Sequence, residues 1–459
     1  MSPMIQSQPE RRLQMMAQLS RLLPRLGLLL LCLIGLFSLT LPVLAANPGD
    51  LDPSFGNGGV ITTTLFSTAT ARAVAIQSDG KIIMFGNSQA NAFALSRHNS
   101  DDSLDSGFGN GGGVTTTIGS NISSGEDVAI QLDGKIVVIG FSSNGGPPYT
   151  FALARYNNNG SLDSNFGKGG IVTTTIGTYA FGFAVAIQPD GKIIVAGNSS
   201  IGGWISFALA RYKSNGSLDS SFGSSGIVTT SFGHNDHGGA VVIQSDGKIV
   251  VGGIHSAGGE DSFALARYNS NGSLDSSFGS SGIVINPVGK LATHGDIAIQ
   301  SDGKIIFIGA SSTNDVSLHF NATLARYNVN GSLDSGFGNS GIVTTSIGSD
   351  IFGNAIAIQP DGKIVVIGGS YYNNQFVTSA LARYTITGSL DSNFGTDGIV
   401  TTTVDLSSDG SDIAIQPDGK IVAAGSSYDG SQGRFTLARY FGDSTNLTRQ
   451  VYLPVVLKQ

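Results

Sequence analysis

Three short motifs recur along the chain, each seven times and always in the same order. The first is Leu-Asp-x-x-Phe-Gly, the second is Gln-x-Asp-Gly-Lys, and the third is Leu-Ala-Arg-Tyr with one degenerate copy. The copies of the first motif begin at Leu51, Leu104, Leu162, Leu218, Leu274, Leu333 and Leu390, about 56 residues apart. Self-similarity at a fixed period of this length indicates one supersecondary unit, repeated in a solenoid or around a ring.

Each repeat contains four strand-like runs separated by turn signals. In the third copy these runs cover residues 184–188, 192–197, 207–212 and 227–230. Asp190-Gly191 lies between the first two runs, and this pair predicts a hairpin because glycine accepts the positive φ of such turns. The second run is apolar at successive positions, which predicts a strand covered on both faces. Four-stranded units covered on both faces are typical of the blades of a β-propeller.

The two ends of the repeat region are out of phase, and this offset predicts how the ring closes. The region begins with a lone fourth strand at residues 60–64 and ends near Tyr440 after a set of first, second and third strands. Pairing the N-terminal strand with the C-terminal blade would complete a seventh blade and leave no open edge. We therefore predict an all-β fold: a seven-bladed β-propeller of four-stranded antiparallel blades over residues 47–440.

The three motifs resemble the delta-60 repeat family, a bacterial β-propeller repeat of unassigned function. The resemblance covers about residues 51–440, and more distantly the first hairpin of each repeat is similar to that of NHL-type propeller repeats. It implies a propeller fold and frequent occurrence in exported proteins. The family has no agreed catalytic residues, so the resemblance assigns none here.

Residues 1–46 have the pattern of a secretory signal peptide. Arginines precede an apolar run from Leu26 to about Phe37, and Val43-Leu44-Ala45 supplies the small residues of a cleavage site. We expect a protein that is secreted or held at the cell surface, with no membrane span after cleavage. The alternative is an uncleaved anchor, because the apolar run is nearly long enough to cross a bilayer. Residues 441–459 form a polar linker and a short apolar tail, for which docking as an edge strand and a sorting role both stay open.

Charge and cysteine content argue against nucleic-acid binding and against a disulfide framework. The chain has a net charge of −7, and residues 1–46 contribute positive charge, so the remainder is more acidic still. An acidic protein has no electrostatic basis for binding nucleic acid. The single cysteine, Cys32, lies in the apolar N-terminal run, so no disulfide framework is available. We expect a monomer.

Charged residues that recur in every repeat are most simply structural. Arg97, Arg155, Arg211, Arg267, Arg326, Arg383 and Arg439 occupy the same position of the third motif. We expect each to pair with an aspartate of the first motif, such as Asp105 or Asp163, because a buried charge needs a partner.

Binding residues are expected on the connections that differ between repeats, namely those after the second and fourth strands, which emerge on one face of the ring. The candidate ligand-binding residues are Tyr149, Trp204, Tyr371, Tyr372, Phe376 and Tyr428. Aromatic side chains near Asn, Asp and Glu suit stacking on a glycan or anchoring a protein partner. Alternatively, these side chains only pack the loops onto the blades.

Histidines are concentrated on the same connections. His234, His237, His255 and His294, with Asp236 and Asp296 nearby, are candidate ligands for a divalent metal such as Zn²⁺; solvated loop histidines are the alternative, and no other cofactor is expected. No catalytic motif with a nucleophile elbow, zinc helix or phosphate loop is present. The sequence favours a binding module for a glycan or protein. A structural envelope component and a metal-assisted hydrolase or lyase are the alternatives.

Overall fold

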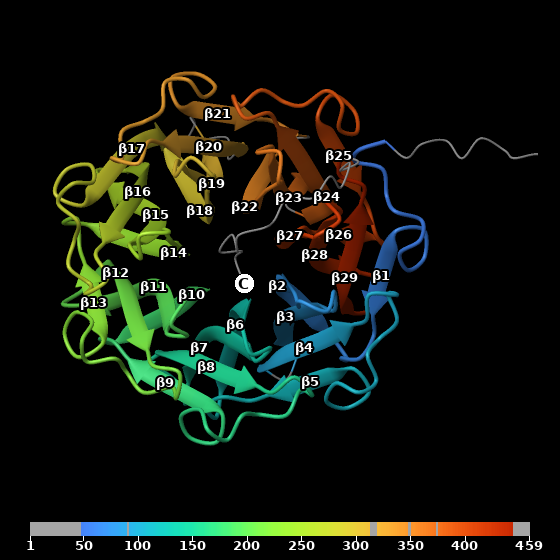
Figure 1. Cartoon of the computed structure of the whole chain (residues 1–459), viewed down its shortest axis with the longest axis horizontal. Helices are drawn as coiled ribbons and strands as arrows, with labels where there is room; N and C mark the ends of the chain where they lie inside the picture. The colour runs from blue at the N-terminus through green and yellow to red at the C-terminus, as the bar shows by residue number, and fades with distance from the viewer. Residues whose placement is uncertain (1–46, 90, 313–318, 348–349, 373–374, 444–459) are drawn as a thin grey trace, which may run out of the picture. The chain divides into compact units, whose positions relative to one another are not determined.

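The computed structural model describes residues 47–443, apart from residue 90 and residues 313–318, 348–349 and 373–374. The secondary-structure elements in this range are all β-strands, and they form seven antiparallel sheets arranged around a ring (Figure 1). The predicted signal peptide, residues 1–46, and the apolar tail lie outside the described residues. Over the described range, no helix has the length and apolar character needed to cross a membrane.

Six blades are each built from four consecutive strands, with the first strand innermost. Blade 1 contains β2 (Ala69–Ile76), β3 (Ile82–Ser88), β4 (Ala92–His98) and β5 (Gly113–Thr116); blade 2 contains β6 (Ile122–Ile130), β7 (Ile136–Ser143), β8 (Thr150–Tyr156) and β9 (Ile171–Thr175). Blade 3 contains β10 (Tyr179–Ile187), β11 (Ile193–Ile201), β12 (Trp204–Tyr212) and β13 (Ile227–Thr230). Blade 4 contains β14 (Asn235–Ile243), β15 (Ile249–Ala257), β16 (Glu260–Tyr268) and β17 (Ile283–Gly289). Blade 5 contains β18 (Leu291–Ile299), β19 (Ile305–Ser312), β20 (Asn321–Tyr327) and β21 (Ile342–Thr345); blade 6 contains β22 (Asp350–Ile358), β23 (Ile364–Tyr372), β24 (Gln375–Tyr384) and β25 (Ile399–Thr402).

Blade 7 closes the ring with strands from both ends of the described chain, as the offset of the repeats predicts. Its C-terminal strands are β26 (Ser407–Ser408), β27 (Asp412–Ile415), β28 (Ile421–Tyr428) and β29 (Gly433–Tyr440). The fourth strand is β1 (Val60–Thr63), which pairs antiparallel with β29 in a register that sets Val60 opposite Ala438. The innermost strand of this blade is divided into β26 and β27, both of which pair with β28.

The hydrophobic core lies between the blades rather than within each one. Every one of the seven clusters of buried apolar side chains joins two neighbouring blades. In β7, Ile136 and Val138 pack toward blade 1, whereas Val137 and Ile139 pack toward blade 3. The second strand is therefore buried on both faces, which confirms the prediction made from its continuous apolar run. Burial of such an aliphatic side chain contributes about 1.5–3 kcal/mol to the free energy of folding.

The repeated arginines form the same buried unit in every blade. In blade 2, the Arg155 guanidinium lies 2.8 Å from a carboxylate oxygen of Asp163 and 4.5 Å from the centre of the Phe166 ring. Arg155 also donates to the backbone oxygen of Ser214, in the next blade. The expected arginine–aspartate pairing is confirmed in all seven blades, with Arg97–Asp105, Arg155–Asp163, Arg211–Asp219, Arg267–Asp275, Arg326–Asp334, Arg383–Asp391 and Arg439–Asp52. These units lie on the face formed by the first-to-second and third-to-fourth strand turns, which we call the fixed face.

The innermost strands carry a second link between blades. Asp127, beside a bulge in β6, accepts a hydrogen bond of 2.8 Å from the backbone N–H of Val185 in blade 3. Asp412 makes the matching bond of 2.8 Å to the N–H of Val74, across the junction between blades 7 and 1. Because the carboxylates are buried and bonded to the next blade, they fasten neighbouring inner strands to one another.

Candidate functional site

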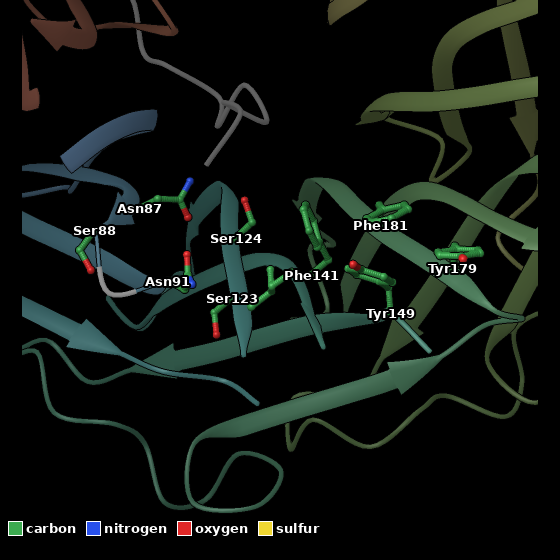
Figure 2. A pocket seen from close by; sticks show the side chains of 10 residues that line it. Asn87, Ser88, Asn91, Ser123, Ser124, Phe141, Tyr149, Tyr179 and Phe181 are labelled. Atoms are coloured by element: carbon green, nitrogen blue, oxygen red, sulfur yellow. The ribbon is translucent and has the colours of Figure 1, made fainter. Parts of the chain in front are cut away.

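A pocket of about 600 Å³ lies on the opposite face, which is formed by the second-to-third strand and fourth-to-first strand connections and which we call the variable face. The pocket is bordered by blades 1, 2 and 3. Its walls are formed by Asn87, Ser88, Asn91, Ile122, Ser123, Ser124, Phe141, Tyr149, Tyr179 and Phe181. Figure 2 shows the aromatic rings gathered on one side of the pocket and the polar side chains on the other.

Four aromatic rings form one wall of the pocket. Tyr149 and Tyr179 are stacked, with ring centres 5.6 Å apart and planes inclined by 25°. Phe181 lies 5.2 Å from Tyr149 and meets Phe141 edge to face at 4.7 Å. Tyr179 and Phe181 share a face of β10 because side chains two residues apart on a strand point the same way. With 40% of its surface exposed, Tyr179 leaves part of this aromatic wall open to solvent.

Backbone hydrogen bonds join Tyr149 in blade 2 to the strand of blade 3 that carries Tyr179 and Phe181. Tyr149 belongs to the β7–β8 connection of blade 2, and its N–H donates to the oxygen of Thr178 at 3.1 Å. The N–H of Ala180 in turn donates to the oxygen of Tyr149 at 3.2 Å. The preceding residues, Pro147 and Pro148, restrict the backbone and favour an extended approach to this pairing.

The opposite wall presents amide and hydroxyl groups that are held in place. The Asn87 amide accepts from the N–H of Gly125 at 2.6 Å and donates to the oxygen of the same residue at 3.1 Å. Asn91 donates to the oxygen of Asn121 at 3.1 Å, and among the described residues nothing donates to its side-chain oxygen. Ser123 exchanges hydrogen bonds with the backbone of Ile118. Polar groups fixed in this way are pre-organised for a ligand.

The pocket lining carries no charged side chain among its ten residues. A carboxylate supports the polar wall, where Glu126 accepts a hydrogen bond of 2.8 Å from Ser124. Burial raises the pKa of Glu126, although Arg72, 3.9 Å away, and Ser124 act in the opposite direction. Glu126 and Arg72 carry groups of opposite charge, so the lining and its immediate support have little net charge.

The candidate ligand-binding residues do not come together in one site. Tyr149 lies in the pocket, whereas Trp204 stands 54% exposed at the start of β12. Tyr428 is 46% exposed, and its hydroxyl donates to the oxygen of Gly430 at 3.0 Å. The side chains of the remaining three, Tyr371, Tyr372 and Phe376, lie outside the described residues.

Of the four aromatic residues of the pocket, three were not among the candidates, namely Phe141, Tyr179 and Phe181. The sequence does hold a signal for two of them: the Tyr179-Ala180-Phe181 run places two aromatic side chains on one strand face just after a variable connection. Phe141, at the loop end of β7, has no comparable signal, because many second strands end in apolar residues.

The four histidines predicted as metal ligands fall into two separate pairs. His234 and His255 lie on the variable face, with ring centres 5.8 Å apart. His237 and His294 belong instead to the inner strands β14 and β18, where burial lowers the pKa of both. Within the described part of the chain, no three His, Cys, Asp or Glu side chains are grouped so that they could hold a metal ion.

His294 packs tightly among the inner strands. Its ring centre lies 5.7 Å from that of Phe183 in blade 3. A side chain on Gly239 in the intervening blade would stand 2.1 Å from the His294 Nδ1 atom, so only glycine fits there. Burial, with a smaller contribution from the charge of His237, lowers the His294 pKa to about 4.

The ring of seven four-stranded blades defines the protein as a β-propeller. The chain belongs to the DUF5122 beta-propeller family, a domain of unknown function, whose model matches residues 77–108, 131–166, 188–222, 244–278, 300–337, 359–394 and 416–445. The first six matched segments run from the second repeat motif to the first motif of the next copy, so the family repeat coincides with the unit found in the sequence. The match confirms the expected propeller family of unassigned function. It does not confirm the name delta-60 for that family.

Solved structures resemble the chain at low sequence identity, and no curated protein sequence matches the chain. A catalytically inactive virginiamycin B lyase from Staphylococcus aureus, bound to quinupristin, is 12% identical with a TM-score of 0.49, covering 83% of this chain and 98% of that one. The polysaccharide lyase Uly1 is 12% identical with a TM-score of 0.49, covering 85% and 92%. Similarities this remote do not indicate a shared ligand or reaction.

Proposed function

We propose that this propeller is a binding module that holds a neutral glycan in the pocket between blades 1, 2 and 3. The observation that carries the proposal is the partly exposed Tyr149–Tyr179 stack, which faces a wall of fixed, uncharged amide and hydroxyl groups. We further propose that the protein acts outside the cell or at its surface, since residues 1–46 carry the pattern of a signal peptide.

The two walls match the two kinds of surface on a sugar. A pyranose ring presents C–H groups on its faces, which pack on aromatic rings, and hydroxyl groups around its edge. The Asn and Ser side chains of the opposite wall can donate to and accept from such hydroxyls. The pocket volume of about 600 Å³ is within the range of small-molecule sites, roughly 300–1,000 Å³.

The charge of the pocket favours a neutral glycan over an acidic one. A carboxylate or sulfate group buried in the pocket would need a cationic partner to offset its loss of hydration. The lining offers none, and the Arg72 guanidinium already lies beside Glu126. An acidic sugar would therefore bind more weakly than its neutral counterpart.

The proposal is tested by screening the purified protein against an array of neutral and acidic glycans and measuring the hits by calorimetry. Tyr149→Ala and Tyr179→Ala should each weaken binding about tenfold, because stacking and the associated burial are lost. Tyr428→Ala is the matched control, since it removes an exposed tyrosine from the same face outside the pocket, and it should leave the affinity unchanged.

Two results would overturn the proposal. One is the absence of any neutral glycan ligand on the array. The other is a glycan whose affinity is the same for the wild type and both pocket variants. If the protein bound another protein instead of a glycan, and Tyr149→Ala weakened that binding, the pocket would still be the binding site. Its ligand would then be a protein and the glycan proposal would be wrong.

A further inference from the structure

A second group of functional side chains lies on the variable face at blades 3 and 4, outside the pocket. It consists of Trp204, His234, Asp236 and His255, and we call it the histidine cluster. His234 lies in the β13–β14 connection, and its ring meets Trp204 edge to face with centres 6.1 Å apart. Asp236 on β14 lies opposite His255 on β15 in the strand register.

The buried aspartate holds one imidazole in position. The Asp236 side chain is fully buried, and one of its oxygens lies 2.6 Å from Nδ1 of His255. Its other oxygen accepts the backbone N–H of Phe232 at 2.6 Å. With Nδ1 directed at the Asp236 carboxylate, Nε2 is the ring nitrogen of His255 that is left to bind a ligand. A carboxylate behind a histidine is the arrangement that orients metal-binding imidazoles in proteins.

The second imidazole lies at a suitable distance to share an ion with the first. Among the described residues, no protein atom makes a hydrogen bond to Nε2 of His255 or to either ring nitrogen of His234. With metal–nitrogen bonds of about 2.0–2.1 Å, two imidazoles on one ion have ring centres roughly 4.5–6.4 Å apart, depending on the bond angle. The observed 5.8 Å falls within that range.

We propose that His234 and His255 bind one divalent ion of the Cu²⁺, Ni²⁺ or Zn²⁺ class, with Asp236 as the residue that orients His255. Neutral imidazole nitrogens suit these ions, whereas Ca²⁺ and Mg²⁺ require oxygen ligands. With two protein ligands the site is open, and the remaining positions are available to water or a ligand. The affinity order follows the general order for nitrogen sites, with Cu²⁺ bound most tightly. The other two histidines, His237 and His294, do not take part.

The chain provides its own reporter for this test. Trp204 is the only tryptophan, and its ring lies 6.1 Å from that of His234, so a paramagnetic Cu²⁺ ion bound there should quench its fluorescence. Titrating the untagged full-length protein with Cu²⁺ should give saturable quenching at one equivalent. Equilibrium dialysis with Ni²⁺ or Zn²⁺ should also give one ion per chain.

Variants distinguish this site from adventitious binding. His234→Ala should weaken binding at least tenfold, and because His234 is exposed this change should leave the fold intact. Asp236→Asn should weaken binding about 10–100-fold, as loss of a supporting carboxylate does at other metal sites. His319→Ala is the matched control, since His319 is an exposed histidine 3.4 Å from Asp350 on the same face, and it should have no effect.

Two outcomes would overturn the proposal. The first is Cu²⁺ quenching that does not saturate or that His234→Ala leaves unchanged. The second is equal loss of binding in His319→Ala and His234→Ala, which would show general surface binding. Neither outcome bears on the glycan pocket, whose residues are separate.

Discussion

The two faces of the ring are built from the same seven repeats but follow opposite rules. On the fixed face each blade carries the same arginine, aspartate and phenylalanine, and the arginine side chains are at most 7% exposed. On the variable face, blades 2 and 3 present an aromatic wall and blades 3 and 4 present the histidine cluster. The difference shows that residues with the same structural role recur in all seven blades. The residues of the pocket and of the histidine cluster, by contrast, belong to particular blades.

The largest expected effect is on the fixed face. Arg155→Ala should lower the free energy of unfolding by about 3–5 kcal/mol, because it leaves Asp163 with less of its compensating charge and removes the contact with Phe166. Urea unfolding followed by circular dichroism measures this change. A loss below about 1 kcal/mol would mean that Lys135, 3.0 Å from Asp163, is a sufficient partner and that the arginine is not structural.

The next effect concerns the pH dependence of stability, and it comes from His294, a residue on an inner strand that differs from its counterparts in other blades. His294 stands where blades 2, 3, 4 and 6 have glycine, namely Gly125, Gly182, Gly238 and Gly353. Since its folded pKa of about 4 lies below the ordinary value of 6.5, the unfolded chain takes up the proton first as the pH falls from 6.5 toward 4. Stability is therefore lost in this window, by about 2 kcal/mol between pH 7 and pH 5.

His294→Gln tests that assignment. The variant should lose less stability than the wild type when urea unfolding is compared at pH 7 and pH 5. His98 and His237, whose pKa values burial also lowers, remain in both proteins and cancel in the comparison. Identical pH dependence in the two proteins would contradict the role given to His294.

A smaller effect is expected at the inner-strand link between blades 7 and 1. Asp412→Ala should cost about 1–2 kcal/mol, because the N–H of Val74 loses its buried acceptor. Asp412→Asn, which keeps an acceptor oxygen, should cost less. Asp127→Ala is the comparison at an ordinary junction, and a much smaller cost there would show that the closing junction depends more heavily on this bond.

The smallest effect is expected on the variable face. Trp204→Ala and Tyr179→Ala remove side chains that are 54% and 40% exposed, so each should change the free energy of unfolding by no more than about 0.5 kcal/mol. The same urea experiment measures both. A loss comparable to that of Arg155→Ala would show that the variable face also supports the ring and would remove the distinction between the two faces.

The repeats made the blades, their closure and the arginine–aspartate pairs predictable, because each of these depends on contacts that recur seven times. Of the pocket residues, the sequence prediction named only Tyr149. Two of the pocket's other rings, those of Tyr179 and Phe181, come from the next blade, and the pairing of the β7–β8 connection with Thr178 and Ala180 leaves no periodic signal. The histidines show a similar limit. His234 and His237 are close in sequence, but side chains alternate along β14, so Asp236 faces His255 while His237 faces elsewhere.

The pairing of β1 with β29 has a consequence for the order in which the ring is made. Residues 60–63 leave the ribosome before their partners at residues 435–438, which are synthesised more than 370 residues later. Until then the first strand has an open edge, and closure joins segments that are far apart in the sequence in a late step. A circular permutant that begins with β2 and carries β1 after β29 would make this contact local and should speed the final step of folding.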